Sequence, residues 1–386
     1  MPLNSAERFL FEQSLHHPLL FRHLVRPGLY RRSEGDPERV HDYVLGMLND
    51  PDAVEVLRSN SYIFDSPWLE ISLNGQRVRA MGTAAGLDKD GDALKPLSLV
   101  YGFQEPGTVI VSQRRGNDRP TVAVGNADDL YNAQGFPSEG MNYFLSQIRY
   151  FRKTMPDYPI YVSECGLPLS EENAVETALA QMKVLLTELD PYVQGHVWNP
   201  FSPNTDALKL LRTPEAFREH AGLMARHAPD KLRLVKMGPY EGDGMEQHLR
   251  LTEAFLDGGG HGIVGPNTKM VPKEQVPSKR WGYKSAGRSG APLKPYRLRM
   301  TADTHQVFPE AVIFACGGIF DGDDAYETFK LGATALESYT PETFYGPGLV
   351  ARKQERVVDR LMADRYDDLE QLQEEVRNGR KLLCDR

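Results

Sequence analysis

The sequence of 386 residues is poor in cysteine and has no excess of positive charge. Its three cysteines, Cys165, Cys316 and Cys384, are widely separated and form no CxxC pair, which argues against a disulfide framework and against a zinc site. A reducing cytoplasm suits them. The formal net charge of −8 lacks the basic bias that nucleic-acid binding requires. Small-molecule chemistry is therefore the favoured class of function, with no nucleic acid as a partner.

Long hydrophobic runs are also missing. No run approaches the roughly 18 apolar residues of a transmembrane helix, and the N-terminus lacks the apolar core and cleavage site of a signal peptide. Residues 9–32 instead mix Phe, Leu and Val with arginines at 22, 26, 31 and 32. Such a segment either lies on an anionic membrane surface or packs on its own domain. We therefore expect a cytoplasmic protein, with peripheral attachment to the cytoplasmic face of the inner membrane left open.

The first seventy or so residues are predicted to be helical. Eight short apolar runs come after them, and each is followed by a turn and a helical stretch. They are VRAMGTAAG, GTVIVSQ, PIYVSEC, GHVWNPF, LRLVKMG, HGIVGPN, AVIFACGG and ALESYT. Buried strands alternating with helices predict a parallel sheet, and eight such units predict a closed (β/α)8 TIM barrel of the α/β class. An open doubly wound sheet is the alternative, although no GxGxxG motif follows the first run. The predicted division is an N-terminal helical extension (1–70), a barrel (71–350) and a C-terminal helical tail (351–386).

Polar and glycine residues gather where these predicted strands end, which is the active-site face of a (β/α)8 barrel. CGGI and the following YTPETFYGPG are typical of a phosphate site, because glycine lets backbone N–H groups approach a phosphate. Lys236 ends the apolar run LRLVK, where it either forms a Schiff base or holds negative charge on a cofactor ring. Lys89, in GLDKDG, is a second cation and favours an anionic substrate beside a phosphorylated cofactor.

The sequence of two further segments allows specific structural predictions. DPERVHDYVLGML predicts a helix with Asp36 as the N-cap and Pro37 at the first helical position. The segment 269–300 has nine Lys or Arg and a single Glu, and is rich in Gly and Pro. It is interpreted either as a mobile lid over an anionic ligand or as a solvated basic loop.

Eight motifs together resemble the dihydroorotate dehydrogenase family, in order and in spacing, over about residues 36 to 350. They are GTAAGLDKDG, EPGTV with GNDRP, NPFSPNT, LVKMGP, PNT at 266–268, RSGAPLKP, CGGI and YTPETFYGP. DPERVH, and Ser202 where the cytosolic branch carries cysteine, resemble the quinone-linked, membrane-associated class 2 branch. The resemblance implies an FMN-dependent flavoprotein that oxidises dihydroorotate to orotate in pyrimidine biosynthesis and passes the electrons to a quinone.

The resemblance also implies roles for individual residues. The expected FMN site comprises Ala84, Ala85, Gly86, Leu87, Asp88, Thr108, Ser163, Asn199, Lys236, Pro266, Gly290, Gly317, Gly318, Tyr339 and Thr340. The expected substrate site comprises Lys89, Asn132, Gly135, Phe136, Asn199, Asn204, Asn267 and Thr268. Ser202, held between Pro200 and Pro203, is the expected catalytic base, and a serine hydroxyl can serve only if it is positioned and relieved of its proton through a polar relay.

Several positions depart from the family pattern. The substrate loop has Ala133 and Gln134 where an arginine is usual, Ser163 and Pro266 stand at other family positions, and the arginine of the quinone site falls at or near Ala123, although His41 is kept. Three interpretations follow: a quinone-linked dihydroorotate dehydrogenase, a related flavin oxidoreductase with another cyclic amide or imide or another acceptor, and a flavin-binding scaffold without turnover.

Overall fold

The computed structural model describes residues 4–59, 66–202 and 205–379. Eight parallel strands form a sheet in the order β4-β3-β14-β13-β10-β9-β8-β7. They are β3 (Met81–Thr83), β4 (Phe103–Gln104), β7 (Tyr161–Glu164), β8 (Gly195–Trp198), β9 (Leu232–Lys236), β10 (Gly262–Gly265), β13 (Val312–Cys316) and β14 (Ala335–Ser338). A parallel bridge between Gln104 and Ile160, which directly precedes β7, joins the two ends of the sheet. The predicted (β/α)8 barrel is confirmed.

The second barrel strand lies earlier in the chain than the sequence predicts. GTVIVSQ (107–113) is the predicted strand, whereas β4 is Phe103–Gln104 and pairs with Gly82 and Thr83 of β3. Phe103 is fully buried, with its ring centroid 5.1 Å from that of Phe314 across the barrel interior. Strand pairing here follows side-chain packing rather than local β propensity. The apolar run at 109–111 is therefore not a barrel strand, and its Val109 forms a single parallel bridge, to Glu164.

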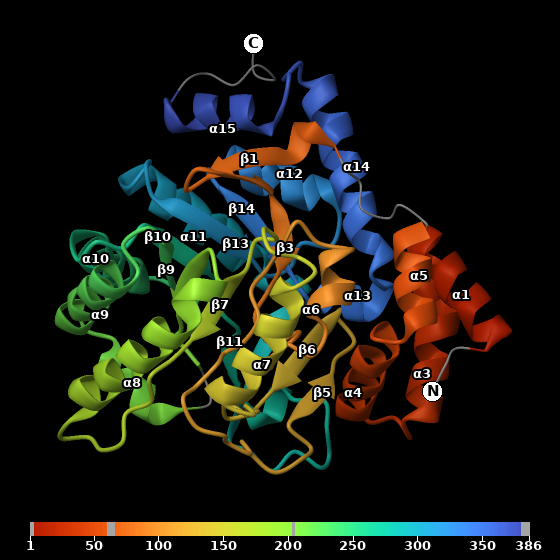
Figure 1. Ribbon diagram of the computed structural model, residues 1–386, viewed down its shortest axis with the longest axis horizontal. Helices are drawn as coiled ribbons and strands as arrows, with labels where there is room; N and C mark the ends of the chain where they lie inside the picture. Colours follow the sequence, from red (N-terminus) through yellow and green to blue (C-terminus); the bar gives the residue numbers. More distant parts are fainter. Residues whose placement is uncertain (1–3, 60–65, 203–204, 380–386) are drawn as a thin grey trace.

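Helices cover the outer face of the barrel (Figure 1). They are α6 (Leu94–Ser98), α7 (Met141–Arg152), α8 (Ala174–Leu189), α9 (Pro214–His227), α10 (Gly244–Asp257), α11 (Lys294–Val307), α12 (Gly322–Lys330), α13 (Thr340–Tyr345) and α14 (Gly348–Ala363). The predicted boundary at residue 350 falls inside α14. Val357, Val358 and Leu361 of this helix are buried in the same apolar cluster as the strands, so α14 packs as part of the barrel shell.

The two ends of the barrel are closed by different elements (Figure 1). The antiparallel pair β1 (Glu70–Leu73) and β2 (Gln76–Arg79), with α15 (Leu369–Arg377), lies at one end. A four-stranded antiparallel sheet lies at the other, in the order β11-β12-β6-β5; its strands are β5 (Val122–Val124), β6 (Asp129–Asn132), β11 (Lys269–Pro272) and β12 (Ser285–Gly290). Within the basic segment 269–300, residues 269–272 and 285–290 are thus paired strands and 294–300 belong to α11, whereas 273–284 is a largely exposed connection around the buried Val276 and Trp281.

The N-terminal helices lie beside the barrel (Figure 1). They are α1 (Ser5–His16), α2 (Pro18–Leu20), the π-helix η1 (Phe21–Val25), α3 (Arg26–Arg32), α4 (Pro37–Leu48) and α5 (Pro51–Ser59). The Asp36 side chain accepts hydrogen bonds from two backbone N–H groups of α4, and Pro37 follows it, so the predicted cap is confirmed. Arg22 pairs with Asp128 at 2.9 Å, and Arg26 donates to the carbonyl of Thr343 at 3.0 Å, which ties these helices to the barrel. Among the described residues, no helix has the length and hydrophobicity to cross a bilayer.

Candidate active site

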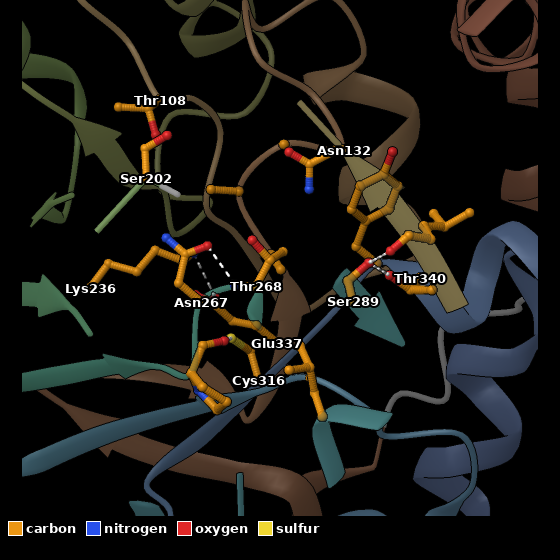
Figure 2. A pocket seen from close by; sticks show the side chains of 18 of the residues that line it. Thr108, Asn132, Ser202, Lys236, Asn267, Thr268, Ser289, Cys316, Glu337 and Thr340 are labelled. Atoms are coloured by element: carbon orange, nitrogen blue, oxygen red, sulfur yellow. Dashed lines mark hydrogen bonds and ion pairs between the residues drawn. The ribbon is translucent and has the colours of Figure 1, made fainter. Parts of the chain in front are cut away.

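The carboxyl ends of the barrel strands and the antiparallel sheet enclose a cavity of about 200 Å³. Most of the residues expected from the sequence line it, from segments that are far apart in the chain. Those residues are Ala84, Ala85, Gly86, Lys89, Thr108, Asn132, Gly135, Phe136, Asn199, Ser202, Lys236, Pro266, Asn267, Thr268, Gly290, Gly317, Gly318, Tyr339 and Thr340. Figure 2 labels ten of the lining residues, with Ser202 and Thr108 on one side and Ser289 and Thr340 on the other.

Three of the expected site residues that the structure describes do not line this cavity. Leu87 lines a second cavity beneath the N-terminal helices. The buried Asp88 accepts hydrogen bonds from the backbone N–H groups of Asp92 and Ala93, and burial raises the pKa of its carboxyl to about 7. Ser163 lies behind Thr108, with the two hydroxyl oxygens 3.1 Å apart. Asn204 falls outside the described residues.

A chain of hydrogen bonds crosses the cavity and holds two asparagines. Asn199 Nδ2 donates to Thr108 Oγ1 at 2.8 Å, and Asn199 Oδ1 accepts from Asn267 Nδ2 at 3.3 Å. Asn267 in turn donates to the carbonyl of Phe201 at 3.3 Å and accepts from the backbone N–H of Thr268 at 2.7 Å. These bonds fix the direction in which each amide presents its donor and acceptor, and an amide pair of this kind can bind a planar amide or imide ring.

The loop that carries Ser202 is fixed from outside the cavity by Arg212. The Arg212 guanidinium donates to the carbonyls of Pro200 at 3.0 Å and Ser202 at 3.3 Å, and lies over the ring of Phe201 at 4.6 Å from its centroid. Ser202 itself lines the cavity. Arg212 thus fixes the backbone on which the Ser202 side chain is presented to the cavity.

Lys236, at the end of β9, is buried between two carboxylates. Its Nζ lies 3.0 Å from both oxygens of Glu105 and 3.8 Å from Glu337 Oε2. Burial lowers the pKa of the ammonium, but the two carboxylates outweigh it and raise the pKa above its usual value. A permanently charged lysine cannot act as the nucleophile of a Schiff base, so the structure favours the electrostatic role of Lys236 over the aldolase-like alternative.

Glu105, Glu337 and Ser289 are site residues that the sequence analysis missed. Glu337 and Ser289 line the cavity, and Ser289 Oγ lies 3.0 Å from Thr340 Oγ1, as Figure 2 shows. An acidic residue inside an apolar run, as in ALESYT, is the signal that marks Glu337, because an unpaired carboxylate is costly in a barrel interior. The pairing of Glu105 with Lys236, 131 positions away, has no local signal.

Three glycines shape the end of the cavity opposite Ser202. Gly290, Gly317 and Gly318 have φ of 94°, 93° and 70°, a conformation that side chains disfavour. A Cβ at Gly318 would lie 2.7 Å from the backbone nitrogen of Lys294, and one at Gly317 would lie 2.9 Å from Leu293 Cβ. Only glycine fits these positions without displacement, so the backbone itself forms this wall.

Lys89 is the cation that remains for an anionic ligand. Its Nζ donates to the carbonyl of Gly86 at 3.4 Å, and it has no ion pair within 4 Å among the described residues. Burial lowers the pKa of this ammonium despite the nearby carboxylates of Asp90 and Asp42. Arg288, the other basic residue considered for this role, is held by Asp129 at 2.6 Å and does not line the cavity.

A second cavity of about 740 Å³ lies between the N-terminal helices and the barrel. Apolar side chains of the helices line it, among them Phe11, Phe21 and Leu24, together with His41 and Arg119. Six residues line both cavities, so one layer of side chains separates them: Lys89, Val122, Leu130, Gln134, Pro137 and Tyr339.

Comparison with known proteins agrees with this geometry. The dihydroorotate dehydrogenase family model matches residues 69–361. A protein of Rhodospirillum rubrum named dihydroorotate dehydrogenase (quinone) is 30% identical over 86% of this chain and 89% of its own length. A protein of Salinispora arenicola with the same name is 30% identical over 86% of this chain and 97% of its own length.

Solved structures show the same fold. A dihydroorotate dehydrogenase of Eimeria tenella in complex with ferulenol has a TM-score of 0.74 at 22% identity, over 90% of this chain and 96% of its own. The ligand-free form has a TM-score of 0.72 at 23% identity, over 83% of this chain and 96% of its own. The resemblance found in the sequence motifs, including that to the quinone-linked branch, is confirmed. The chain belongs to the dihydroorotate dehydrogenase family of oxidoreductases.

Proposed function

We propose that this protein binds FMN and oxidises dihydroorotate to orotate, a step of pyrimidine biosynthesis, with a quinone as electron acceptor. The observation that carries the proposal is a cavity in which a fixed serine, two oriented asparagines and an unpaired lysine surround one space. An enzyme that oxidises dihydroorotate needs three kinds of group: a base, amide partners for a cyclic imide, and a cation for a carboxylate.

The residues present fit a flavin. Thr268 Oγ1 is buried at the cavity wall without a hydrogen-bond partner among the described residues, as are both carboxyl oxygens of Glu337, so the cavity offers polar atoms that a ligand would satisfy. Gly290, Gly317 and Gly318 leave backbone free of side chains at one end, where a phosphate would approach. Lys236 supplies a fixed positive charge beside the ring.

Each polar residue then has a defined task in the proposed reaction. Bound FMN supplies the hydride acceptor. Ser202 removes a proton from the dihydropyrimidine carbon, Asn199 and Asn267 orient the imide, and Lys89 pairs with the carboxylate. The antiparallel sheet over the cavity excludes water. Ser163 supports Thr108 from behind and thereby sets the acceptor that Asn199 contacts.

Reduction by dihydroorotate tests the proposal directly. The purified protein is expected to be yellow with about one non-covalent FMN per chain, and anaerobic dihydroorotate is expected to bleach it. Absorbance spectra before and after substrate, with flavin content measured after denaturation, give both answers. A colourless protein that cannot be reconstituted with FMN would contradict the cofactor, and a yellow protein that dihydroorotate does not bleach would contradict the substrate.

The N-terminal helices fit a quinone drawn from a membrane. They line the apolar cavity, and their outer surface leaves Phe9, Leu19 and Leu24 exposed by 59%, 65% and 53%. Exposed apolar residues next to arginines are typical of a helix that lies in a lipid interface. We therefore propose that the helices within residues 1–70 form a membrane-contacting extension of the barrel.

Removing the exposed apolar side chains tests this surface. The triple variant Phe9→Ser, Leu19→Ser, Leu24→Ser is expected to bind anionic vesicles at least about tenfold more weakly, because each apolar side chain contributes roughly 1.5–3 kcal/mol on burial. Vesicle co-sedimentation measures the change, and reduction of the flavin by dihydroorotate is the activity that stays at the parent rate. Leu169→Ser, at an apolar side chain exposed by 77% on the barrel, is the control. Unchanged vesicle binding by the triple variant would leave the helices with a structural role only.

A further inference from the structure

Glu337 stands out because it is fully buried, lines the cavity and has no hydrogen-bond partner among the described residues, its ion pair with Lys236 being long at 3.8 Å. It lies in β14, opposite Cys316 of β13 on one side and Gly82 of β3 on the other. The exposed fraction of its side chain is 0%, and neither carboxyl oxygen has a hydrogen-bond partner among the described residues. Figure 2 labels it with Cys316 in the pocket. A buried carboxyl without a partner is rare in native proteins and calls for a specific explanation.

The charges around Glu337 do not balance if it is ionised. Lys236 is the cation of this cluster, and both oxygens of Glu105 occupy it at 3.0 Å. Glu105 is anchored independently, since its backbone N–H donates to Thr83 Oγ1 at 3.1 Å. Glu337 lies 3.8 Å from Lys236, beyond hydrogen-bond distance. Two ionised carboxylates and one ammonium would bury a net negative charge, which is expensive in a low-dielectric interior.

A proton on Glu337 removes this cost. The other titratable group that faces it is the thiol of Cys316, and burial raises the pKa of that thiol to about 12, so it stays neutral and supplies no charge. Burial, followed by the adjacent carboxylate of Glu105, raises the pKa of Glu337 well above its usual value. The cluster then holds one ammonium, one carboxylate and one neutral acid, with a net charge of zero.

We propose that Glu337 is a neutral carboxylic acid whose hydroxyl donates a hydrogen bond to an acceptor atom of a planar heterocycle bound in the cavity. That the heterocycle is the ring of FMN rests on the proposed function. The cavity then combines a fixed ion pair, Lys236 with Glu105, and a neutral donor, Glu337. Glu337 is thereby a binding residue that favours ligands with a hydrogen-bond acceptor at this position and disfavours them once it ionises.

Infrared difference spectroscopy tests the protonation state without reference to activity. Glu337→Gln at neutral pH is expected to remove one carbonyl band of a protonated carboxylic acid from the spectrum of the purified protein. Glu342→Gln is the matched control, because Glu342 is a buried glutamate paired with Lys353 at 2.6 Å and its loss should remove only carboxylate bands. Loss of carboxylate bands alone in Glu337→Gln would overturn the proposal.

The affinity for FMN tests the hydrogen bond. Glu337→Gln keeps a neutral donor, whereas Glu337→Leu removes it, so the leucine variant is expected to bind FMN about 3- to 10-fold more weakly than the glutamine variant. Fluorescence titration of the apoprotein with FMN measures both. In the parent protein the affinity should fall as Glu337 ionises at alkaline pH, and in Glu337→Gln this component should disappear. Equal affinities of the two variants would contradict the donor role. Failure of every form, parent included, to bind FMN would contradict the cofactor assignment and leave the infrared result to decide the protonation state.

Discussion

Replacing Ser202 by Ala is expected to slow the reduction of the flavin by dihydroorotate roughly 10²- to 10⁴-fold, the range that a positioned base contributes. Ser202 lines the cavity, and Arg212 holds its backbone at 3.3 Å and that of Pro200 at 3.0 Å. The alanine variant keeps these backbone contacts, so the flavin content should not change. Stopped-flow absorbance under anaerobic conditions measures the rate directly.

Two further variants separate catalysis from folding. Ser202→Cys should retain more activity than Ser202→Ala, because a cysteine thiolate held in the same place can also take up a proton from carbon. Ser146→Ala removes a hydroxyl that donates to the carbonyl of Tyr143 on the exposed face of α7, and it should reduce its flavin at the parent rate. If Ser202→Ala also matched the parent rate, the base would have to be another group.

The hydrogen-bonded residues beside the Ser202 loop would help a serine to act as the base that we propose. Thr108, Asn199 and Asn267 form a continuous chain of hydrogen bonds beside the loop. Such a chain restricts where the substrate ring can lie and therefore where its acidic carbon meets the hydroxyl. Holding a weak base at a fixed distance from carbon compensates in part for its poor basicity at neutral pH.

Much of the site could be predicted because it depends on positions along the chain. In a (β/α)8 barrel the residue at the end of each strand faces the same cavity, so Lys236, Asn267 and Thr340 converge although the sequence separates them. Eight apolar runs with turns between them were enough to indicate that architecture. The place of Gly317 and Gly318 in the site could likewise be predicted. Both have a positive φ, which residues other than glycine rarely adopt.

The rest depends on packing that the sequence does not display. β4 is only two residues long, and Phe103 is selected by the interior space beside Tyr161 and Phe314, whereas the stronger apolar run at 109–111 is not a barrel strand. Glu105 and Lys236 meet across the interior because β4 and β9 end at the same level. The paired strands within 269–300 have no clear sequence pattern, because Gly, Pro and charged residues interrupt them. Antiparallel strands at a surface bury only every second side chain, so they need no continuous apolar run.

The substrate assignment depends most on how the cavity treats a carboxylate. Ala133, at the position of the usual arginine, is buried among Ala123, Val271 and Trp281, and it does not line the cavity. The described residues that line the cavity include no arginine, and Lys236 is occupied by Glu105. If dihydroorotate is the substrate, Lys89 would therefore supply the positive charge. Burial lowers the pKa of Lys89 more than the nearby carboxylates of Asp90 and Asp42 raise it, and a bound carboxylate would favour the charged form further.

Replacing Lys89 by Ala is accordingly expected to raise the dihydroorotate concentration for half-maximal flavin reduction about 10- to 100-fold, since a hydrogen bond to a charged group contributes about 1.5–3 kcal/mol. The parent protein should prefer dihydroorotate to dihydrouracil, which lacks the carboxylate, and Lys89→Ala should lose this preference because its reaction with dihydrouracil does not change. Lys95→Ala, at an exposed lysine of α6, is the control and should keep the parent preference. Anaerobic titration of flavin absorbance with each compound, six titrations for the three proteins, gives these comparisons. A parent protein that prefers dihydrouracil would defeat the dihydroorotate assignment and favour a neutral cyclic amide or imide as substrate, while the flavin-binding barrel would stand, because Lys236 and the three glycines do not depend on Lys89.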